Sequence, residues 1–244
     1  FTDGQVRPFL PHTQPLNLSE LISILTDYKR AYLKPVNGSQ GQGIYLVERE
    51  EVTDHFWVYS SESAQINPIV LNHITQLSRF IELLQKKEAY IAQQAIPLLT
   101  FEGQLVDFRF LLHYYKRHWH VTSSVARVGD KDRIISNQAQ GGQLFKPLHV
   151  LKQWFPSEAK RKFKEMSALS IKTAQAVQKW SDGLYCELGL DLAIDKNGEI
   201  WILEVNSKPS KTSPLREEIQ KRPSTRALCQ TCLSLFQEQI DSKT

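Results

Sequence analysis

The stretch GLDLAIDKNGEIWILEVNSKP, residues 189–209, decides how the second half of the chain folds. Two apolar runs flank Asn197-Gly198, and this dipeptide between such runs is the strongest short signal for a tight β-hairpin turn. With the turn there, the register sets Lys196 against Glu199, Asp195 against Ile200, Ile194 against Trp201 and Asp191 against Glu204. The stretch therefore predicts a hairpin with two carboxylates directly opposite each other.

Asp191 and Glu204 need a reason to face each other, because like charges opposite in a β-ladder are destabilising. A divalent cation would reverse the sign of that interaction. Asn206 lies two residues further on the same face, so the three side chains offer hard oxygen ligands, too few for a closed cage. This is the chemistry of Mg²⁺ held jointly by protein and phosphate oxygens. The alternative is that Asp191 points to solvent at a strand end. The apolar run around Glu204, where a free carboxylate is costly, favours the metal site.

A second informative stretch, LKPVNGSQGQGIYLVE, covers residues 33–48. It is not a Walker A loop, because no lysine follows the last glycine. It is not a dinucleotide-binding fingerprint either, because the spacing is GxxGxG and the next segment reads as a strand. A glycine loop between two strands is a hairpin flap whose N–H groups could close over a polyphosphate, with Lys34 beside it as a point charge. An ordinary glycine-rich hairpin is the alternative, and this stretch alone does not decide between them.

The composition is that of an ordinary globular protein, with 244 residues, 41% of them hydrophobic and 23% charged. No run approaches the ~20 apolar residues of a membrane span, and the N-terminus has no signal-peptide pattern, so we expect no membrane partner. The net charge of +4 is modest and no basic cluster is interleaved with aromatic residues. We therefore expect a site for an anionic small molecule and no nucleic-acid partner.

Cysteine usage points to a reducing cytoplasm, because Cys186, Cys229 and Cys232 do not form a disulfide scaffold. Cys229 and Cys232 form a C-x-x-C with no second ligand pair for zinc nearby, which favours buried structural cysteines. His118 and His120 share a strand face, but no third metal ligand is evident there. We interpret that segment as a solvated hairpin.

Hydrophobic periodicity divides the chain into two α+β lobes, expected at 1–92 and 93–244 with a hinge near Pro97. The first lobe begins with a helix that Asn17 caps and continues through the glycine flap, a strand at 55–60, a helical stripe over 71–84 and a strand at 89–93. The second lobe has long strands at 105–114 and 120–128. A long helix from Ser157 to near Trp180, the hairpin at 190–206 and a C-terminal helix follow.

The two informative stretches together resemble the ATP-grasp family, whose fold consists of two α+β lobes with the nucleotide site between them. LKPVNGSQGQGI resembles its lysine and glycine-loop segment, IAQQAI its interlobe strand, and LDLAID followed by WILEVNSKP its Asp…Glu-x-Asn metal motif. YLKPVNGSQGQGI, VDFRFL, VARVGDKDRIISNQAQGG and GLDLAID are more closely similar to the endospore coat-associated ATP-grasp proteins of the YheC/YheD type. The resemblance covers roughly residues 10–210, and it adds an association with the spore to the expected cytoplasmic location.

The resemblance implies a role for each matching position. Lys34 would contact the nucleotide phosphates, and the closing flap would consist of Gly38, Ser39, Gln40, Gly41 and Gly43. Gln93, Gln94 and Ile96 would frame adenine, and Asp191, Glu204 and Asn206 would hold one or two Mg²⁺ ions. Asn137 would shape a loop near the acceptor. Arg109 and Arg127 could each stabilise a transferring phosphoryl group or bind a substrate carboxylate. A structural pair between Arg109 and Asp107 is the alternative.

The expected activity is ATP- and Mg²⁺-dependent ligation of a carboxylate to an amine through an acyl phosphate, with small-molecule or peptide substrates. A kinase on the same scaffold and a nucleotide-binding, spore-coat-associated protein with little turnover remain alternatives. The family's further phosphate-binding lysine and its N-terminal substrate domain would fall before residue 1. The sequence names neither the two substrates nor the oligomeric state.

Overall fold

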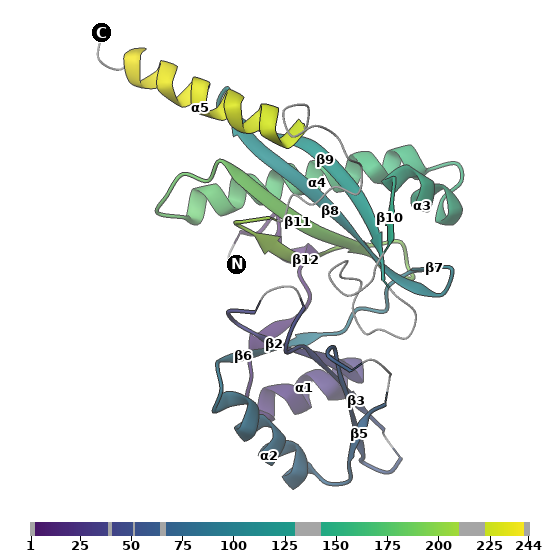
Figure 1. The fold of residues 1–244 in the computed structure, drawn as a ribbon. Helices are drawn as coiled ribbons and strands as arrows, with labels where there is room; N and C mark the ends of the chain where they lie inside the picture. The colour runs from purple at the N-terminus through teal and green to yellow at the C-terminus, as the bar shows by residue number, and fades with distance from the viewer. Residues whose placement is uncertain are drawn as a thin grey trace. The chain divides into compact units, whose positions relative to one another are not determined.

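The computed structural model describes residues 3–38, 41–50, 52–63, 67–129, 143–209 and 223–241. The chain divides into two compact units (Figure 1). Unit 1 comprises Phe1–Phe9, Asp107–Arg127 and Leu144–Thr244, and unit 2 comprises Leu10–Val106 and Val128–Gln143. The lobes expected from the sequence, 1–92 and 93–244, have other bounds and stay a prediction.

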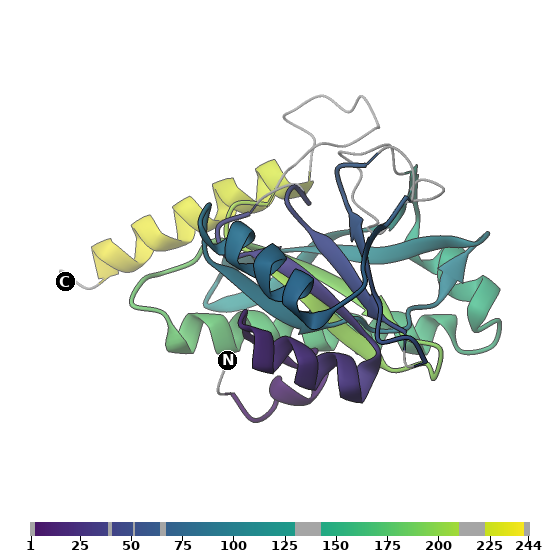
Figure 2. The ribbon, with the colours of Figure 1, turned by 90° about the horizontal axis from the view of Figure 1, so that it is seen from below.

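Unit 2 is an antiparallel sheet with two helices on one face (Figures 1 and 2). Its strands follow the order β1-β6-β2-β3-β4-β5. The bounds are β1 Thr13–Pro15, β2 Arg30–Pro35, β3 Tyr45–Arg49, β4 Phe56–Ser60, β5 Ile69–Leu71, β6 Tyr90–Gln94, α1 Leu18–Tyr28 and α2 Ile74–Gln85. Leu21 and Ile24 of α1, Leu77 of α2 and Leu33 of β2 are buried together in its core.

The local signals in unit 2 are mostly confirmed. The Asn17 side chain accepts a hydrogen bond from the Glu20 N–H at 2.9 Å, so α1 begins with the predicted cap. β2 and β3 pair on the two sides of the glycine stretch, as expected. The helical stripe predicted over 71–84 begins too early, because Leu71 belongs to the short edge strand β5 and α2 starts only at Ile74. Three residues of strand are too few to show an alternating pattern.

Unit 1 contains most of a second sheet, with the strand order β10-β9-β8-β11-β12 (Figure 1). Its strands are β8 Gln104–Tyr115, β9 His118–Val128, β10 Gln143–Phe145, β11 Glu187–Ile194 and β12 Ile200–Asn206, and β7 Thr100–Phe101 pairs with the start of β8. The helices are η1 Arg7–Phe9, α3 Pro147–Trp154, α4 Ala159–Trp180 and α5 Pro223–Asp241. Phe108 and Phe110 of β8 contact the aromatic rings of Trp154 on α3 and Phe163 on α4.

The helices of unit 1 differ from the sequence expectation in two respects. The sequence did not reveal α3, because its eight residues give only two turns of periodicity, although Pro147 suits the first helical position. The long helix α4 is confirmed and buries Met166, Leu169 and Thr173, but Trp180 at its end is 61% exposed. Helical spacing places Trp180 on the same face as Met166, Leu169 and Thr173, so its exposure at the helix end departs from that pattern.

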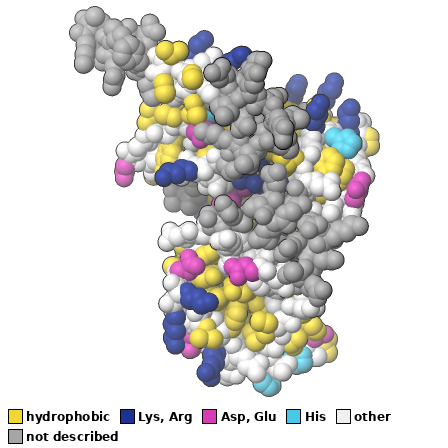
Figure 3. Space-filling view, viewed as in Figure 1, with side chains coloured by type: hydrophobic (Ala, Val, Ile, Leu, Met, Phe, Trp, Pro, Cys, Tyr) yellow, Lys and Arg dark blue, Asp and Glu magenta, His cyan; other side chains and the backbone are white. Residues whose placement is uncertain are grey.

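The surface of the described residues carries both charge signs. Figure 3 shows Lys and Arg side chains interspersed with Asp and Glu and with hydrophobic side chains on the drawn face. In the part of the chain that the structure describes, no helix combines the length and the apolar character needed to cross a membrane.

The turn of the β11–β12 hairpin is one residue longer than predicted. The Asp195 N–H donates to the Glu199 carbonyl at 3.0 Å, and Gly198, with φ of 84°, occupies the left-handed region. This is a three-residue loop in place of the predicted Asn-Gly turn. The predicted pairs near the turn are therefore wrong, and Ile194 faces Ile200. A register shift between Asp191 and Leu192 then cancels the offset, so that Asp191 faces Glu204 as predicted.

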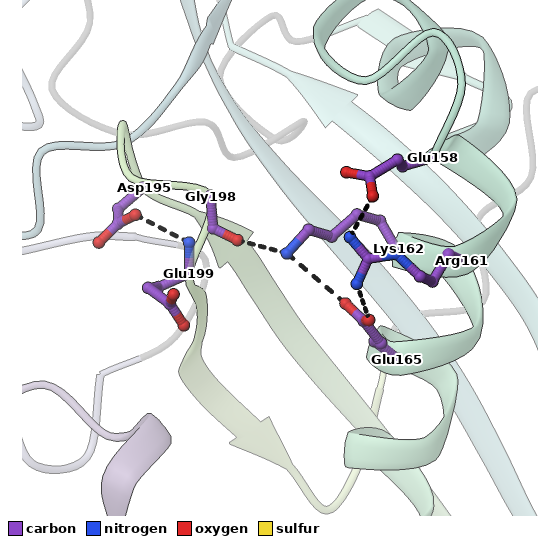
Figure 4. Close-up of polar contacts among 7 residues, drawn as sticks. All are labelled: Glu158, Arg161, Lys162, Glu165, Asp195, Gly198 and Glu199. Atoms are coloured by element: carbon purple, nitrogen blue, oxygen red, sulfur yellow. Dashed lines mark hydrogen bonds and ion pairs between the residues drawn. The ribbon is translucent and has the colours of Figure 1, made fainter.

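Two side chains hold this turn in place (Figure 4). Asp195 is buried and accepts from the Asn197 N–H at 2.8 Å, the Glu199 N–H at 2.9 Å and the Trp201 indole N–H at 3.0 Å. Lys162 of α4 donates to the Gly198 carbonyl at 2.6 Å, and its neighbour Glu165 lies 3.5 Å from the same ammonium group. The hairpin is thereby attached to the helix that covers its sheet.

Replacing Gly198 should destabilise the protein through the backbone alone. A Cβ at this position would meet Phe155 at 3.6 Å, an ordinary contact, but the left-handed conformation would remain strained. We expect Gly198→Ala to lower the free energy of unfolding by about 1 kcal/mol in urea titrations. Gly183→Ala is the matched control, because a Cβ there meets nothing within 4 Å. Equal stability of the Gly198 variant and wild type would contradict the observed turn.

Candidate functional site

One face of the unit 1 sheet carries a line of charged side chains. Along β8, Phe108 and Phe110 point to the helices α3 and α4, so Asp107 and Arg109 point to the opposite face. Arg109 pairs directly with Asp191 of β11, and Asp191 pairs with Glu204 of β12. The sheet therefore sets a guanidinium and two carboxylates in one row across three adjacent strands.

Asp191 is the centre of a buried ion-pair network. Its carboxylate is 3% exposed and accepts from both Nε and Nη2 of Arg109, the latter at 2.8 Å. Arg127 Nη2 lies 2.8 Å from the same Oδ2, while Arg127 Nε donates to Asp107 Oδ1 at 2.6 Å. The two arginines proposed as catalytic residues are thus brought together with the first proposed metal ligand.

The electrostatics of this network favour ionised side chains. Burial by itself would raise the pKa of Asp191, but the hydrogen bonds and charges of Arg109 and Arg127 outweigh burial and hold that pKa below its ordinary value of 3.8. Burial would likewise lower the pKa of Arg127, and the charges of Asp107 and Asp191 raise it instead. The Asp191 carboxylate and the Arg127 guanidinium group therefore keep their charges at neutral pH.

The other two proposed metal ligands are differently placed. Glu204 is exposed and makes no hydrogen bond or ion pair with any residue that the structure describes, so the expectation of a costly buried carboxylate was wrong. Exposure differs along β12, because Ile200 and Ile202 are buried whereas Glu204 is exposed. Asn206 is half-buried, and its Nδ2 is a buried donor without a partner among the described residues. It lies opposite Gly189, where Pro209 leaves no room for a Cβ.

These residues fit a magnesium ion as a partial ligand set. A carboxylate has about four lone-pair positions, and three donors occupy Asp191, so one position is left for a cation. Glu204 adds a free carboxylate and Asn206 an amide oxygen. Among the described residues no group of three His, Cys, Asp or Glu side chains could hold a metal alone. An ion here would need further oxygens from a ligand, as Mg²⁺ in phosphate sites does.

In unit 2, Lys34 lies on the sheet face opposite the helices. Its neighbour Leu33 points into the core, so the Lys34 side chain points the other way. Its ammonium donates to Gln93 Oε1 at 2.6 Å and lies 5.6 Å from the centre of the Tyr32 ring. Gln93 in turn donates to Thr13 Oγ1 at 2.9 Å. The structure therefore joins two predicted nucleotide-binding residues, Lys34 and Gln93, in one hydrogen-bonded row.

Side chains from elsewhere in unit 2 anchor the glycine stretch. Ser61 donates to the Gly41 carbonyl at 2.7 Å and accepts from the Ile44 N–H at 3.3 Å, while Tyr90 donates to the Gly43 carbonyl at 3.1 Å. Gly41 and Gly43 have φ values of 74° and 67°, which explains glycine at these positions. The sequence offered no signal for Ser61 or Tyr90, because these contacts depend on strand pairing.

The remaining predicted residues are placed as follows. Gln94 is at the end of β6, and its N–H donates to the His12 carbonyl at 2.8 Å, so this N–H is already occupied. The Ile96 carbonyl accepts from the Leu98 N–H at 2.9 Å. Gly38 begins the glycine stretch, where a Cβ would come 2.5 Å from Pro35. Ser39, Gln40 and Asn137 lie outside the described residues.

Two further segments contain residue types that can bind metals, the hairpin with His118 and His120 and the helix with Cys229 and Cys232. Lys116 and Arg117 form the β8–β9 turn with φ of 50° and 63°, as the hairpin interpretation requires. His118 is exposed, and the ring of His120 stacks on Tyr115 at 3.9 Å. Cys229 and Cys232 are exposed, so their predicted burial was wrong. They lie on the outer side of α5, where Ala227 and Thr231 are buried.

The family model described as YheC/D like ATP-grasp matches residues 2–235. The chain belongs to this ATP-grasp family. It is 29% identical over 217 residues to the endospore coat-associated protein YheD of Bacillus subtilis, and 25% identical over 242 residues to YheC of the same organism. These alignments cover 86% and 96% of this chain but 46% and 64% of the relatives. The chain thus spans less than two thirds of the length of either relative.

Two further proteins resemble this ATP-grasp chain. Tubulin glycylase 3B of Tetrahymena thermophila is 28% identical over 218 residues, which is 81% of this chain and 18% of that protein. The crystal structure of D-alanyl-alanine synthetase A from Vibrio cholerae superposes with a TM-score of 0.55 at 10% identity, covering 92% of this chain and 60% of that one. Such a likeness concerns the fold, and it confirms the predicted α+β ATP-grasp class.

Because the pKa of Asp191 is lowered in the folded protein, the free energy of unfolding should depend on pH. Because that pKa is lower in the folded protein, the ionised carboxylate stabilises the fold above about pH 4 and this contribution is lost as the pH falls further. We expect Asp191→Asn to lower the free energy of unfolding by about 3 kcal/mol at pH 7, because two half-buried guanidinium groups lose a partner.

The deficit of Asp191→Asn should shrink as the pH falls below 3.8, because Asp191 of the unfolded wild-type chain then takes up a proton and the ionised folded carboxylate loses its advantage. Urea titrations at several pH values measure both effects. Asp182→Asn, at an exposed position, is the control and should match wild type throughout. A deficit that stays constant into the acid range would show that the charge of Asp191 is not what stabilises the network.

Proposed function

We propose that the protein is an ATP- and Mg²⁺-dependent ligase that joins a carboxylate to an amine. The observation that carries this proposal is the row of Arg109, Asp191 and Glu204 in a chain of the ATP-grasp family. Similarity to a tubulin glycylase and to a D-alanyl-alanine synthetase, both named after bond formation with an amino acid, supports an amino-acid or peptide substrate.

Residues of unit 2 would bind the nucleotide. Lys34 presents an ammonium group on the open face of β2, held by Gln93 at 2.6 Å. The glycine stretch, fixed at its C-terminal end by Ser61 and Tyr90, would direct N–H groups to the phosphates. Gln94 and Ile96 would border adenine. Because the Gln94 N–H is occupied, we assign that contact to the carbonyl oxygen of Gln94 and the N–H of Ile96.

Residues of unit 1 would serve the metal and the transferred group. Asp191, Glu204 and Asn206 would hold Mg²⁺, which when bound neutralises phosphate oxygens. Arg109 and Arg127 would bind the γ-phosphoryl group or the substrate carboxylate through their planar forks. A carboxylate oxygen then attacks the γ-phosphorus and ADP leaves. The amine attacks the resulting acyl phosphate at its carbonyl carbon, loses a proton and releases inorganic phosphate.

We also propose that the protein acts in association with the spore. The names of two relatives, both endospore coat-associated proteins, support this location.

A turnover assay distinguishes ligation from the alternatives. The protein is incubated with Mg²⁺·ATP and N-acetylated amino acids as carboxylates or amino-acid amides as amines, and ADP is measured with each set alone and in pairs. We expect ADP only when a carboxylate and an amine are both present, together with a product that mass spectrometry finds lighter than its two substrates by one water. A phosphorylated product with a single substrate would instead identify a kinase.

Glu204 gives the sharpest single-residue test of the metal assignment. We expect Mg²⁺·ATP to raise the melting temperature of wild type above the effect of either ligand alone. Glu204→Gln removes one carboxylate from an exposed position, so the ligand-free variant should melt within a few degrees of wild type while the Mg²⁺-dependent gain disappears. Glu199→Gln on the same hairpin is the control and should keep the gain. If Glu204→Gln keeps it as well, the hairpin is not the metal site.

A further inference from the structure

The three donors on Asp191 create a conflict with a metal ion. Nε and Nη2 of Arg109 and Nη2 of Arg127 all contact this carboxylate. A cation at the remaining lone pair would lie beside two guanidinium groups in a buried place, where like charges repel strongly. The Asp191 carboxylate can therefore bind the two arginines fully or the metal fully. Binding both at once costs free energy.

The net charge of the network indicates which second ligand would relieve the repulsion between the cation and the guanidinium groups. Arg109 and Arg127 contribute two positive charges and Asp107, Asp191 and Glu204 three negative ones, so the sum is about −1. One divalent cation brings the sum to about +1. An oxyanion would restore the balance, and the guanidinium groups are the donors that it would engage.

We infer that Asp191 exchanges partners, so that cation binding and oxyanion binding at this site each raise the affinity for the other. An oxyanion on the guanidinium groups draws them away from Asp191 and frees its oxygens for the cation. A cation on Asp191 releases the same N–H groups for the oxyanion. This reciprocity is required by linkage once the two events share one carboxylate. The inference rests on the proposed function, because it assumes that the metal binds at Asp191.

Asp107 is the positioning residue in this exchange. It is 4% exposed and holds Arg127 through Nε at 2.6 Å, which leaves Nη2 as the group that contacts Asp191. Arg127 can therefore change the partner of Nη2 without leaving its place. Arg109 has no such second acidic partner among the described residues, so it would move further.

The exchange is measured by metal binding and does not depend on turnover. Mn²⁺ serves as the cation, with the free ion followed by electron paramagnetic resonance, and sulfate serves as the oxyanion, with chloride at equal ionic strength as its control. We expect sulfate to lower the Kd for Mn²⁺ by about fivefold or more in wild type. Sulfate without effect, or a weaker affinity for Mn²⁺, would overturn the inference.

Three variants locate the effect. Arg109→Gln should bind Mn²⁺ more tightly than wild type without sulfate, because one repelling charge is gone, and should lose most of the sulfate effect. Asp107→Asn should bind Mn²⁺ but show a reduced sulfate effect, and a full effect in that variant would overturn the role of Asp107. Arg161→Gln is the control, since Arg161 is exposed and pairs with Glu158 and Glu165 on α4 (Figure 4).

Failure of the inference is distinguishable from failure of the proposed function. If Mn²⁺ binding is lost in Glu204→Gln but sulfate changes nothing in wild type, the metal site stands and the exchange is wrong. If Glu204→Gln binds Mn²⁺ as wild type does, the proposed metal site itself is wrong. The comparison in wild type needs no variant, so a variant that fails to fold leaves the main result intact.

Discussion

The burial of one carboxylate, that of Asp191, is the constraint on which the site of unit 1 depends. A buried ion is expensive unless it is paired and hydrogen-bonded. Arg109 from β8 and Arg127 from β9 supply those bonds, and Asp107 neutralises the second arginine. The strand order β9-β8-β11-β12 is what places these four residues and Glu204 on neighbouring strands. A different order would leave an unpaired charge in the sheet.

The glycine stretch in unit 2 is held by backbone conformation and hydrogen bonds, whereas the site of unit 1 is held by ion pairs. Its shape depends on backbone positions with positive φ and on hydrogen bonds from Ser61 and Tyr90. Lys34 is oriented by Gln93 and the ring of Tyr32. Unit 2 thus presents the ammonium group of Lys34, which would suit a phosphate, whereas unit 1 presents nearly balanced charges, which would suit a metal and an oxyanion bound together.

Much of this could be predicted from the sequence, because local signals and alternation determine it. The cap at Asn17, the strands around the glycine stretch and the pairing of Asp191 with Glu204 are confirmed. The predicted pairing of Asp191 with Glu204 is correct because two differences from the predicted hairpin cancel. One is the longer turn, and the other is the register shift. Periodicity does not reveal a shift of this kind.

The partners of Asp191 could not be predicted, because they come from residues more than sixty positions away in the chain. The alternation of Val106-Asp107-Phe108-Arg109 indicated a polar face but not which acid each arginine contacts. The exposure of Glu204 was missed because an apolar run suggests burial, whereas in β12 Ile200 and Ile202 are buried and Glu204 is not. Short elements such as α3 and β5 fall below the length at which periodicity is informative.

The most direct test of the central claim is a crystal structure with Mg²⁺ and a non-hydrolysable ATP analogue. We expect an ion about 2.1 Å from oxygens of both Asp191 and Glu204, with phosphate oxygens completing its coordination. We also expect that at least one arginine has left Asp191 for a phosphate oxygen. An ion bound elsewhere, with Asp191 still held by both arginines, would contradict the account.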